Sequence, residues 1–143
     1  MPDSGCEFPK QNATSEEISK LLDNVKTVAV VGISPKEERP SHWISLYLRD
    51  NGFDVVGVNP GHTELMGFKV YPTVSAIPGP IDLVNIFVRS ENVGPIVDDA
   101  IAKKAKFIWM QEGVVNNAAA DKARAAGLVV VMNKCIYKEH AAR

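Results

Sequence analysis

The chain contains little cysteine, few aromatic residues and no long apolar run. Cys6 and Cys135 are the only cysteines among 143 residues, and they form neither a CxxC pair nor a disulfide-rich framework. The apolar runs are only as long as strands, and the N-terminus lacks the basic-then-apolar order of a signal peptide. We therefore expect a protein of the reducing cytoplasm that does not span a membrane.

An excess of charge of one sign is also absent. The chain has 16 basic and 17 acidic residues, which gives a net charge of −1. Nothing in this balance predicts the broad basic surface that binds nucleic acid, so we expect no nucleic-acid partner. His42, His62 and His140 have no metal-ligand spacing with one another or with cysteine, so we predict no metal site.

Apolar runs recur along the chain and are separated by helical patterns. The runs are continuous rather than alternating, which is typical of parallel strands with both faces buried. They span residues 27–32, 54–58, 82–88, 106–110 and 128–132, with a further short strand left open at 66–72. Helical patterns begin near residues 14, 41, 93 and 116. This alternation predicts an α/β fold with a doubly wound, mainly parallel sheet of five to six strands in three αβα layers.

The first 13 residues differ from the rest of the chain. Residues 1–13 are polar and show no periodicity, so we predict a flexible N-terminal arm. Thr14 and Glu17 have capping-box spacing, which indicates that the first helix starts there. The chain length fits one domain, which we place at residues 14–143.

The most informative stretch is the turn after the first predicted strand. Gly32 ends the apolar run, Lys36 and Arg39 follow it, and a helical pattern begins near Ser41. A strand-to-helix turn of this kind holds phosphorylated ligands in open α/β sheets, because free backbone N–H groups and the helix dipole favour an anion. Ser34 lies in the same turn. The turn therefore predicts a site for a nucleotide-like ligand.

Other strand ends are expected to meet at the same edge of the sheet, because ligands bind beyond the carboxyl ends of parallel strands. These ends carry Asn59-Pro60-Gly61-His62, Phe87-Val88-Arg89-Ser90 and Gln111-Glu112-Gly113. Arginine and backbone donors suit phosphate, whereas Pro60 and Phe87 suit the faces of a flat base. The set predicts a ligand that has both phosphate groups and a flat base.

Two features argue against an ordinary nicotinamide or flavin dinucleotide. No glycine follows Gly32 until Gly52, so the G-x-G-x-x-G turn is missing. The second strand ends on Asn59, where a dinucleotide-binding protein usually places an acid for the ribose diol. A phosphorylated ribose is compatible with Asn59, because no carboxylate there would repel it.

Four segments resemble the stand-alone coenzyme A binding domain proteins, which are similar to the N-terminal domain of the succinyl-CoA synthetase α subunit. They are VAVVGISPKEERPSHWISLYLRDNGFDVVGVNPG, VYPTVSAIPGPIDLVNIFVRSENV, IWMQEGVVN and VVMNKCIYKEH. The resemblance covers about residues 25–140 and implies a Rossmann-like fold that binds CoA or a short acyl-CoA. The synthetase uses a histidine in a second domain, so the resemblance implies no ligase chemistry for this polypeptide alone.

The resemblance also implies roles for individual positions. The first loop would cradle the phosphates, Asn59 and Pro60 would flank the adenosine, Phe87 and Arg89 would form the opposite wall, and Gln111 and Gly113 would lie lower in the crevice. The loop positions matched in this way are Gly32, Ile33, Ser34, Arg39, Pro40 and Ser41.

Simpler interpretations stay open for several of these residues. Arg39 also fits a solvated surface position beside two glutamates, Arg89 a structural ion pair, and Phe87 the core. Cys135 beside Lys134 fits either an activated thiol or a small buried side chain. The alternative functions are an NAD(P)-dependent oxidoreductase and a nucleotide-sensing regulatory module. A homodimer stays open as the oligomeric state.

Overall fold

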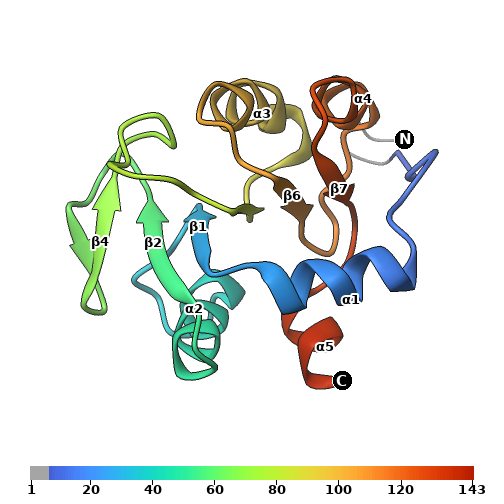
Figure 1. The fold of residues 1–143 in the computed structure, drawn as a ribbon. Helices are drawn as coiled ribbons and strands as arrows, with labels where there is room; N and C mark the ends of the chain where they lie inside the picture. Colours follow the sequence, from blue (N-terminus) through green and yellow to red (C-terminus); the bar gives the residue numbers. More distant parts are fainter. Residues whose placement is uncertain (1–6) are drawn as a thin grey trace.

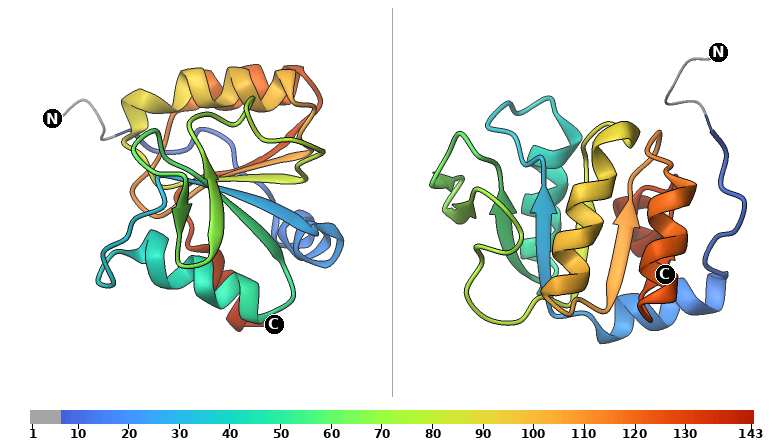
Figure 2. Two further views of the ribbon diagram at one scale, coloured as in Figure 1. Left: turned by 90° about the vertical axis from the view of Figure 1, so that its left-hand side faces the viewer. Right: turned by 90° about the horizontal axis from the view of Figure 1, so that it is seen from above.

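The computed structural model describes residues 7–143, which form a central sheet with helices on both faces (Figures 1 and 2). The strands are β1 (Thr27–Val31), β2 (Asp54–Val58), β3 (Glu64–Leu65), β4 (Phe68–Tyr71), β5 (Leu83–Ile86), β6 (Phe107–Met110) and β7 (Val129–Val131). The helices are α1 (Ser15–Asn24), α2 (Pro40–Asp50), α3 (Val93–Ala102), α4 (Asn117–Ala125) and α5 (Ile136–Ala141), with a 3-10 turn, η1 (Ser90–Asn92).

The sheet confirms the doubly wound α/β prediction. Its strand order is β3-β4-β2-β1-β5-β6-β7, and every pair is parallel except β3 with β4. The chain moves outward from β1 on one side and returns to pair β5 on the other, so the crevice expected at a reversal of strand order lies between β1 and β5. The described part of the chain has seven strands, one more than the predicted maximum. The extra strand, β3, is too short for any periodicity to reveal it.

Helices cover both faces of the sheet, as the continuous apolar strands require. α3 and α4 pack on one face through side chains that include Val97, Ala100 and Ala120. α1, α2 and α5 cover the other face, where Leu21 and Leu48 are fully buried. The central strands β1, β5 and β6 therefore bury both of their sides, and the helices and the sheet form the three layers seen in Figure 1.

The helix boundaries follow the predicted patterns closely, with two exceptions. Thr14 and Glu17 form the capping box at the start of α1, each accepting a hydrogen bond from the other's backbone N–H. The sequence reading did not predict η1 or α5. Both are short, so neither shows a full helical period, and tertiary contacts specify them.

Residues 7–13 lie against the domain. The Glu7 carboxylate accepts two hydrogen bonds of 2.8 Å from Asn117, and Asn12 exchanges hydrogen bonds of 2.8 and 2.9 Å with the backbone of Met132. The predicted flexible arm covered residues 1–13, of which residues 1–6 lie outside the described part of the structure. No pattern in the sequence predicts the contacts that residues 7–13 make with α4 and with Met132, the residue after β7.

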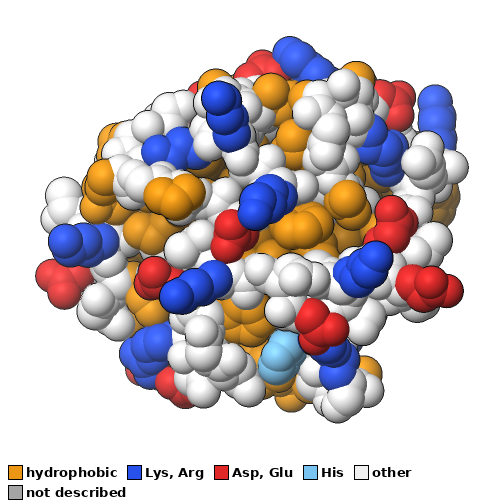
Figure 3. All heavy atoms as spheres, in the orientation of Figure 1, with side chains coloured by type: hydrophobic (Ala, Val, Ile, Leu, Met, Phe, Trp, Pro, Cys, Tyr) orange, Lys and Arg blue, Asp and Glu red, His pale blue; other side chains and the backbone are white. Residues whose placement is uncertain are grey.

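The surface carries charges of both signs. Figure 3 shows lysine and arginine side chains interspersed with acidic ones on the face it displays, as the near-zero net charge predicts. Within residues 7–143, no helix is long and apolar enough to cross a membrane.

Candidate functional site

Three adjoining cavities lie along the edge where β1, β2, β5 and β6 end. The central one, which we call the basic cavity, measures about 290 Å³. It is lined by Gly32, Ser34, Lys36, Arg39, Pro40, Ser41 and Phe87. Residues from the β1–α2 loop and from the end of β5 thus meet on either side of the point where strand order reverses.

Gly32 determines how the chain leaves β1. Its φ is +88°, a conformation that side-chain-bearing residues rarely adopt, and its N–H donates a 2.9 Å hydrogen bond to the carbonyl oxygen of Val58. A Cβ at this position would lie 3.3 Å from Val88 Cγ1 and 3.4 Å from the Phe87 backbone. Glycine therefore lets the loop pass close to the end of β5.

Local hydrogen bonds give the loop a defined shape. The Ser34 hydroxyl accepts a 3.1 Å hydrogen bond from the N–H of Lys36. The Ser34 carbonyl oxygen lies 2.9 Å from His42 Nδ1, and since a carbonyl only accepts, His42 carries a proton on that nitrogen. His42 is buried, so it holds the loop to α2 rather than facing a ligand.

The N-terminus of α2 points its positive dipole end at the basic cavity. Among residues 7–143, no side chain caps this helix, its first turn holds no acid, and Pro40 occupies a first-turn position. Arg39 precedes it and is exposed. Pro40 has no N–H, and the N–H groups of His42 and Trp43 donate to the carbonyl oxygen of Arg39. The helix dipole and two cationic side chains therefore make the basic cavity suited to a phosphate group.

The second cavity, which we call the apolar cavity, adjoins the basic cavity at Gly32 and measures about 370 Å³. It is lined by Val31, Gly32, Val58, Asn59, Pro60, Pro72, Thr73, Val74, Val88, Pro95, Ile96 and Asp99. Its apolar walls and scattered polar atoms suit a flat heteroaromatic ring.

The third cavity, which we call the terminal cavity, adjoins the basic cavity at Pro40 and Phe87 and measures about 260 Å³. It is lined by Pro40, Trp43, Ile44, Phe87, Gln111, Glu112, Cys135 and Lys138. The three cavities thus form a series along one edge of the sheet.

Buried and charged groups order the wall of the terminal cavity. Gln111 is buried, accepts a 3.2 Å hydrogen bond from the N–H of Ile136, and donates one to Asn85 Oδ1. Lys138 pairs with Glu112 at 3.0 Å, and the hydrogen bond and charge of that carboxylate raise the pKa of Lys138 above its ordinary value. Gln111 therefore fixes the start of α5, which carries the cationic part of the wall.

Comparisons with known proteins identify the family. Residues 26–141 match the CoA binding domain family. The chain belongs to that family. Protein YneT of Bacillus subtilis, itself uncharacterized, is 37% identical over 131 residues, which cover 92% of this chain and 97% of YneT. A solved structure of a hypothetical protein from Pyrococcus horikoshii OT3 is 39% identical, with a TM-score of 0.89 and 96% of each chain covered.

One enzyme relative is much longer than this chain. The ADP-forming acetate–CoA ligase I of Archaeoglobus fulgidus is 39% identical over 74 residues, which cover 52% of this chain but only 11% of the ligase. This member of the CoA binding domain family is therefore homologous to a small part of that enzyme.

Most residues predicted for the site border the cavities. Gly32, Ser34, Lys36, Arg39, Pro40 and Ser41 surround the basic cavity, Asn59 and Pro60 the apolar one, and Phe87 and Gln111 the terminal one. Ile33, Arg89 and Gly113 do not line any of the three. Ile33 is fully buried in the core, Arg89 is exposed at the start of η1, and Gly113 donates to Asn133 Oδ1.

Sequence reasoning missed several lining residues. Pro72 and Thr73 directly follow β4, so strand-end reasoning would have found them had that strand been assigned. Pro95 and Ile96 belong to α3, so they do not follow a strand and strand-end reasoning could not reach them. Lys138 lies on α5, a helix the sequence did not predict.

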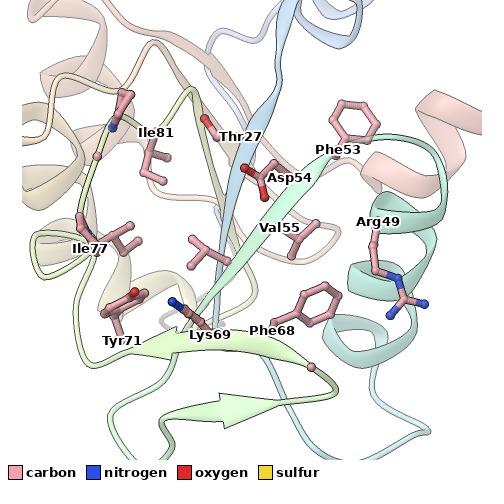
Figure 4. A pocket seen from close by; sticks show the side chains of 15 residues that line it. Thr27, Arg49, Phe53, Asp54, Val55, Phe68, Lys69, Tyr71, Ile77 and Ile81 are labelled. Carbon is pink, nitrogen blue, oxygen red and sulfur yellow. The ribbon is translucent and has the colours of Figure 1, made fainter.

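A cavity larger than these three lies elsewhere, at the opposite edge of the sheet (Figure 4). It measures about 560 Å³, and its lining includes Thr27 and Asp54, the first residues of β1 and β2. Arg49 lies 5.7 Å from the centre of the Phe68 ring there. Open α/β sheets bind ligands at the carboxyl ends of their strands, whereas this cavity lies at the amino ends of β1 and β2.

Within residues 7–143, histidine, cysteine, aspartate and glutamate form no group of three that could hold a metal ion.

Proposed function

We propose that the chain binds coenzyme A, or a short acyl-CoA, in the series of cavities at the carboxyl edge of the sheet. In this proposal the adenine occupies the apolar cavity, the diphosphate occupies the basic cavity and the pantetheine arm enters the terminal cavity. Membership of the CoA binding domain family supports the assignment.

The observation that carries the proposal is the order of the three cavities. The apolar and basic cavities share Gly32, and the basic and terminal cavities share Pro40 and Phe87. CoA has the same order of parts: a flat base, a charged diphosphate and a long amide chain. A ligand with only one of these parts would leave most of the crevice unused.

The residue roles follow from this placement. Arg39 and Lys36 would neutralise phosphate charge, the N-terminus of α2 would donate to phosphate oxygens, and Pro60 would contact the base. The predicted ligand contacts at Ile33, Arg89 and Gly113 remain predictions from the resemblance, and the cavities themselves do not require them.

Calorimetry tests the proposal directly. Purified protein, freed of any ligand carried through expression, is titrated with CoA, dephospho-CoA, NAD and NADP. We expect CoA to bind more tightly than the other three. A folded, ligand-free protein with no measurable affinity for CoA would refute the proposal, and tighter binding of NADP would favour the oxidoreductase alternative. The cytoplasmic location, the lack of a nucleic-acid partner and the oligomeric state stay predictions from the sequence.

A further inference from the structure

The Cys135 thiol is part of the lining of the terminal cavity. Cys135 is 8% exposed, and it borders the terminal cavity together with Phe87, Gln111 and Lys138. It forms no disulfide within the described residues. The sulfur is thus largely shielded from bulk solvent but adjacent to a space that a ligand can enter.

The series of cavities orients a bound CoA toward that thiol. A diphosphate in the basic cavity has the apolar cavity on one side and the terminal cavity on the other. Because the pantetheine arm leaves the diphosphate on the side opposite the adenine, its sulfur end enters the cavity that Cys135 lines. Two sulfur atoms, one from the ligand and one from the protein, then share a small space.

Polar side chains line the terminal cavity together with Cys135, and a buried amide nitrogen next to Gln111 lacks a hydrogen-bond partner in the described part of the chain. Asn85 is fully buried and accepts from Gln111, and within residues 7–143 its side-chain nitrogen has no hydrogen-bond acceptor. Buried polar groups are rarely left unpaired. Asn85 does not itself line the terminal cavity, but Gln111, to which it is hydrogen-bonded, does. Lys138 lies in the same wall of the terminal cavity, where its ammonium group pairs with the Glu112 carboxylate.

We propose, on the basis of the proposed CoA site, that Cys135 undergoes thiol–disulfide exchange with the disulfide of CoA. The Cys135 thiolate attacks one sulfur of the CoA disulfide, and the sulfur–sulfur bond of that ligand breaks. One CoA becomes joined to Cys135 Sγ, and the other leaves as a thiolate that takes a proton from water. The CoA disulfide is itself the oxidant, so the step balances without another reactant.

Intact-protein mass spectrometry tests the exchange. Reduced, ligand-free protein is incubated with CoA disulfide or, in parallel, with glutathione disulfide, and the modified peptide is then mapped. We expect one CoA adduct at Cys135 that a reducing agent removes, formed at least about tenfold faster than the glutathione adduct. We also expect Arg39→Ala to slow CoA adduct formation about tenfold or more at limiting CoA disulfide, because it weakens phosphate binding.

Variants separate this proposal from the binding proposal. Cys135→Ser and Cys135→Ala should abolish the adduct yet still bind reduced CoA in calorimetry, and Cys6→Ser should react like the parent chain. Reduced CoA that binds without any adduct from its disulfide would refute the exchange and leave the binding proposal intact. Equal rates for the two disulfides, unaffected by Arg39→Ala, would also refute it. If reduced CoA does not bind at all, the binding proposal is wrong.

Discussion

The side-chain amide of Asn59 donates a 2.9 Å hydrogen bond to the carbonyl oxygen of Ile33, across the gap between the end of β2 and the β1–α2 loop. The Asn59 oxygen accepts a second hydrogen bond of 2.9 Å from the N–H of Gly61. Asn59 therefore joins two loops of the crevice. Asn59 stands where dinucleotide-binding proteins usually have an acid, and the structure explains this difference. An amide can donate a hydrogen bond to the carbonyl oxygen of Ile33, whereas a carboxylate could not.

Replacing Asn59 by alanine should weaken CoA binding and destabilise the fold. The change removes two hydrogen bonds, each worth about 1 kcal/mol, and frees the loop that forms the basic cavity. We expect the free energy of unfolding to fall by about 1–2 kcal/mol in denaturant titrations, and the affinity for CoA to fall several-fold in calorimetry. His62→Ala is the matched control, because His62 is exposed in the same loop. Lower stability with unchanged affinity would show that the loop keeps its shape without Asn59.

Arg39 and Arg89 provide a direct comparison of two predicted phosphate contacts. Arg39 lines the basic cavity, whereas Arg89 does not. A charged contact is worth about 1.5–3 kcal/mol, so Arg39→Ala should lower the affinity for CoA roughly ten- to a hundredfold, with little change in melting temperature. We expect a smaller effect from Arg89→Ala. An equal loss in both variants would mean that Arg89 reaches the ligand, as the resemblance implied.

Asp82 should make stability depend on pH in the acid range. Burial alone would raise the pKa of Asp82, but hydrogen bonds from the N–H groups of Lys26 and Thr27, a hydrogen bond from the Thr27 side chain and the charge of Lys106 together lower the pKa below its ordinary value. The folded state therefore holds the charged carboxylate more strongly than the unfolded state does. The stabilisation is present above the unfolded pKa of about 3.9 and is lost as pH falls through the lower folded value.

The Asp82→Asn variant measures this contribution. We expect it to be less stable than the parent chain at neutral pH, and the difference in free energy of unfolding to shrink as the pH falls below about 4. Glu91→Gln, at an exposed position, should change stability little at any pH. A difference between the Asp82 variant and the parent that stays constant down to the lowest accessible pH would contradict the assignment.

Two glycines should respond in opposite ways to replacement by alanine. A Cβ at Gly57 in β2 would lie 2.9 Å from Ile33 Cγ2 and 3.0 Å from Val70 Cγ2, so Gly57→Ala should cost about 1–3 kcal/mol of stability. A Cβ at Gly94 in α3 would meet no atom within 4 Å, so Gly94→Ala should leave stability unchanged or raise it by up to about 1 kcal/mol. Thermal unfolding of the two variants checks both. A stable Gly57→Ala variant would mean that the Ile33 side chain shifts readily.

The patterns that span many residues made the fold predictable. The apolar runs at β1, β2, β5, β6 and β7 identified buried parallel strands, and the capping box at Thr14 placed the start of α1 correctly. β3 and α5 escaped prediction because each is too short to show a period. They form only because neighbouring elements hold them.

Residues that line the candidate cavities could be predicted where they directly follow a strand that the sequence had identified. The sheet brings such residues together, so Gly32, Ser34, Asn59, Pro60 and Phe87 could be grouped from their positions alone. Lining residues that lie on helices could not be assigned to the cavities from their positions in the sequence. Lys138 and Ile96 reach the cavities only through the packing of α5 and α3.

The sequence by itself determined the strand-to-helix alternation, the glycine turn after β1 and the family to which the chain belongs, because these depend on local residue types and their spacing. Only the tertiary structure decided that Asn59 holds the loop, that Ile33 lies in the core, and that Cys135 borders the third cavity. Those outcomes depend on contacts between residues far apart in the chain, and side-chain packing alone determines which of these contacts form.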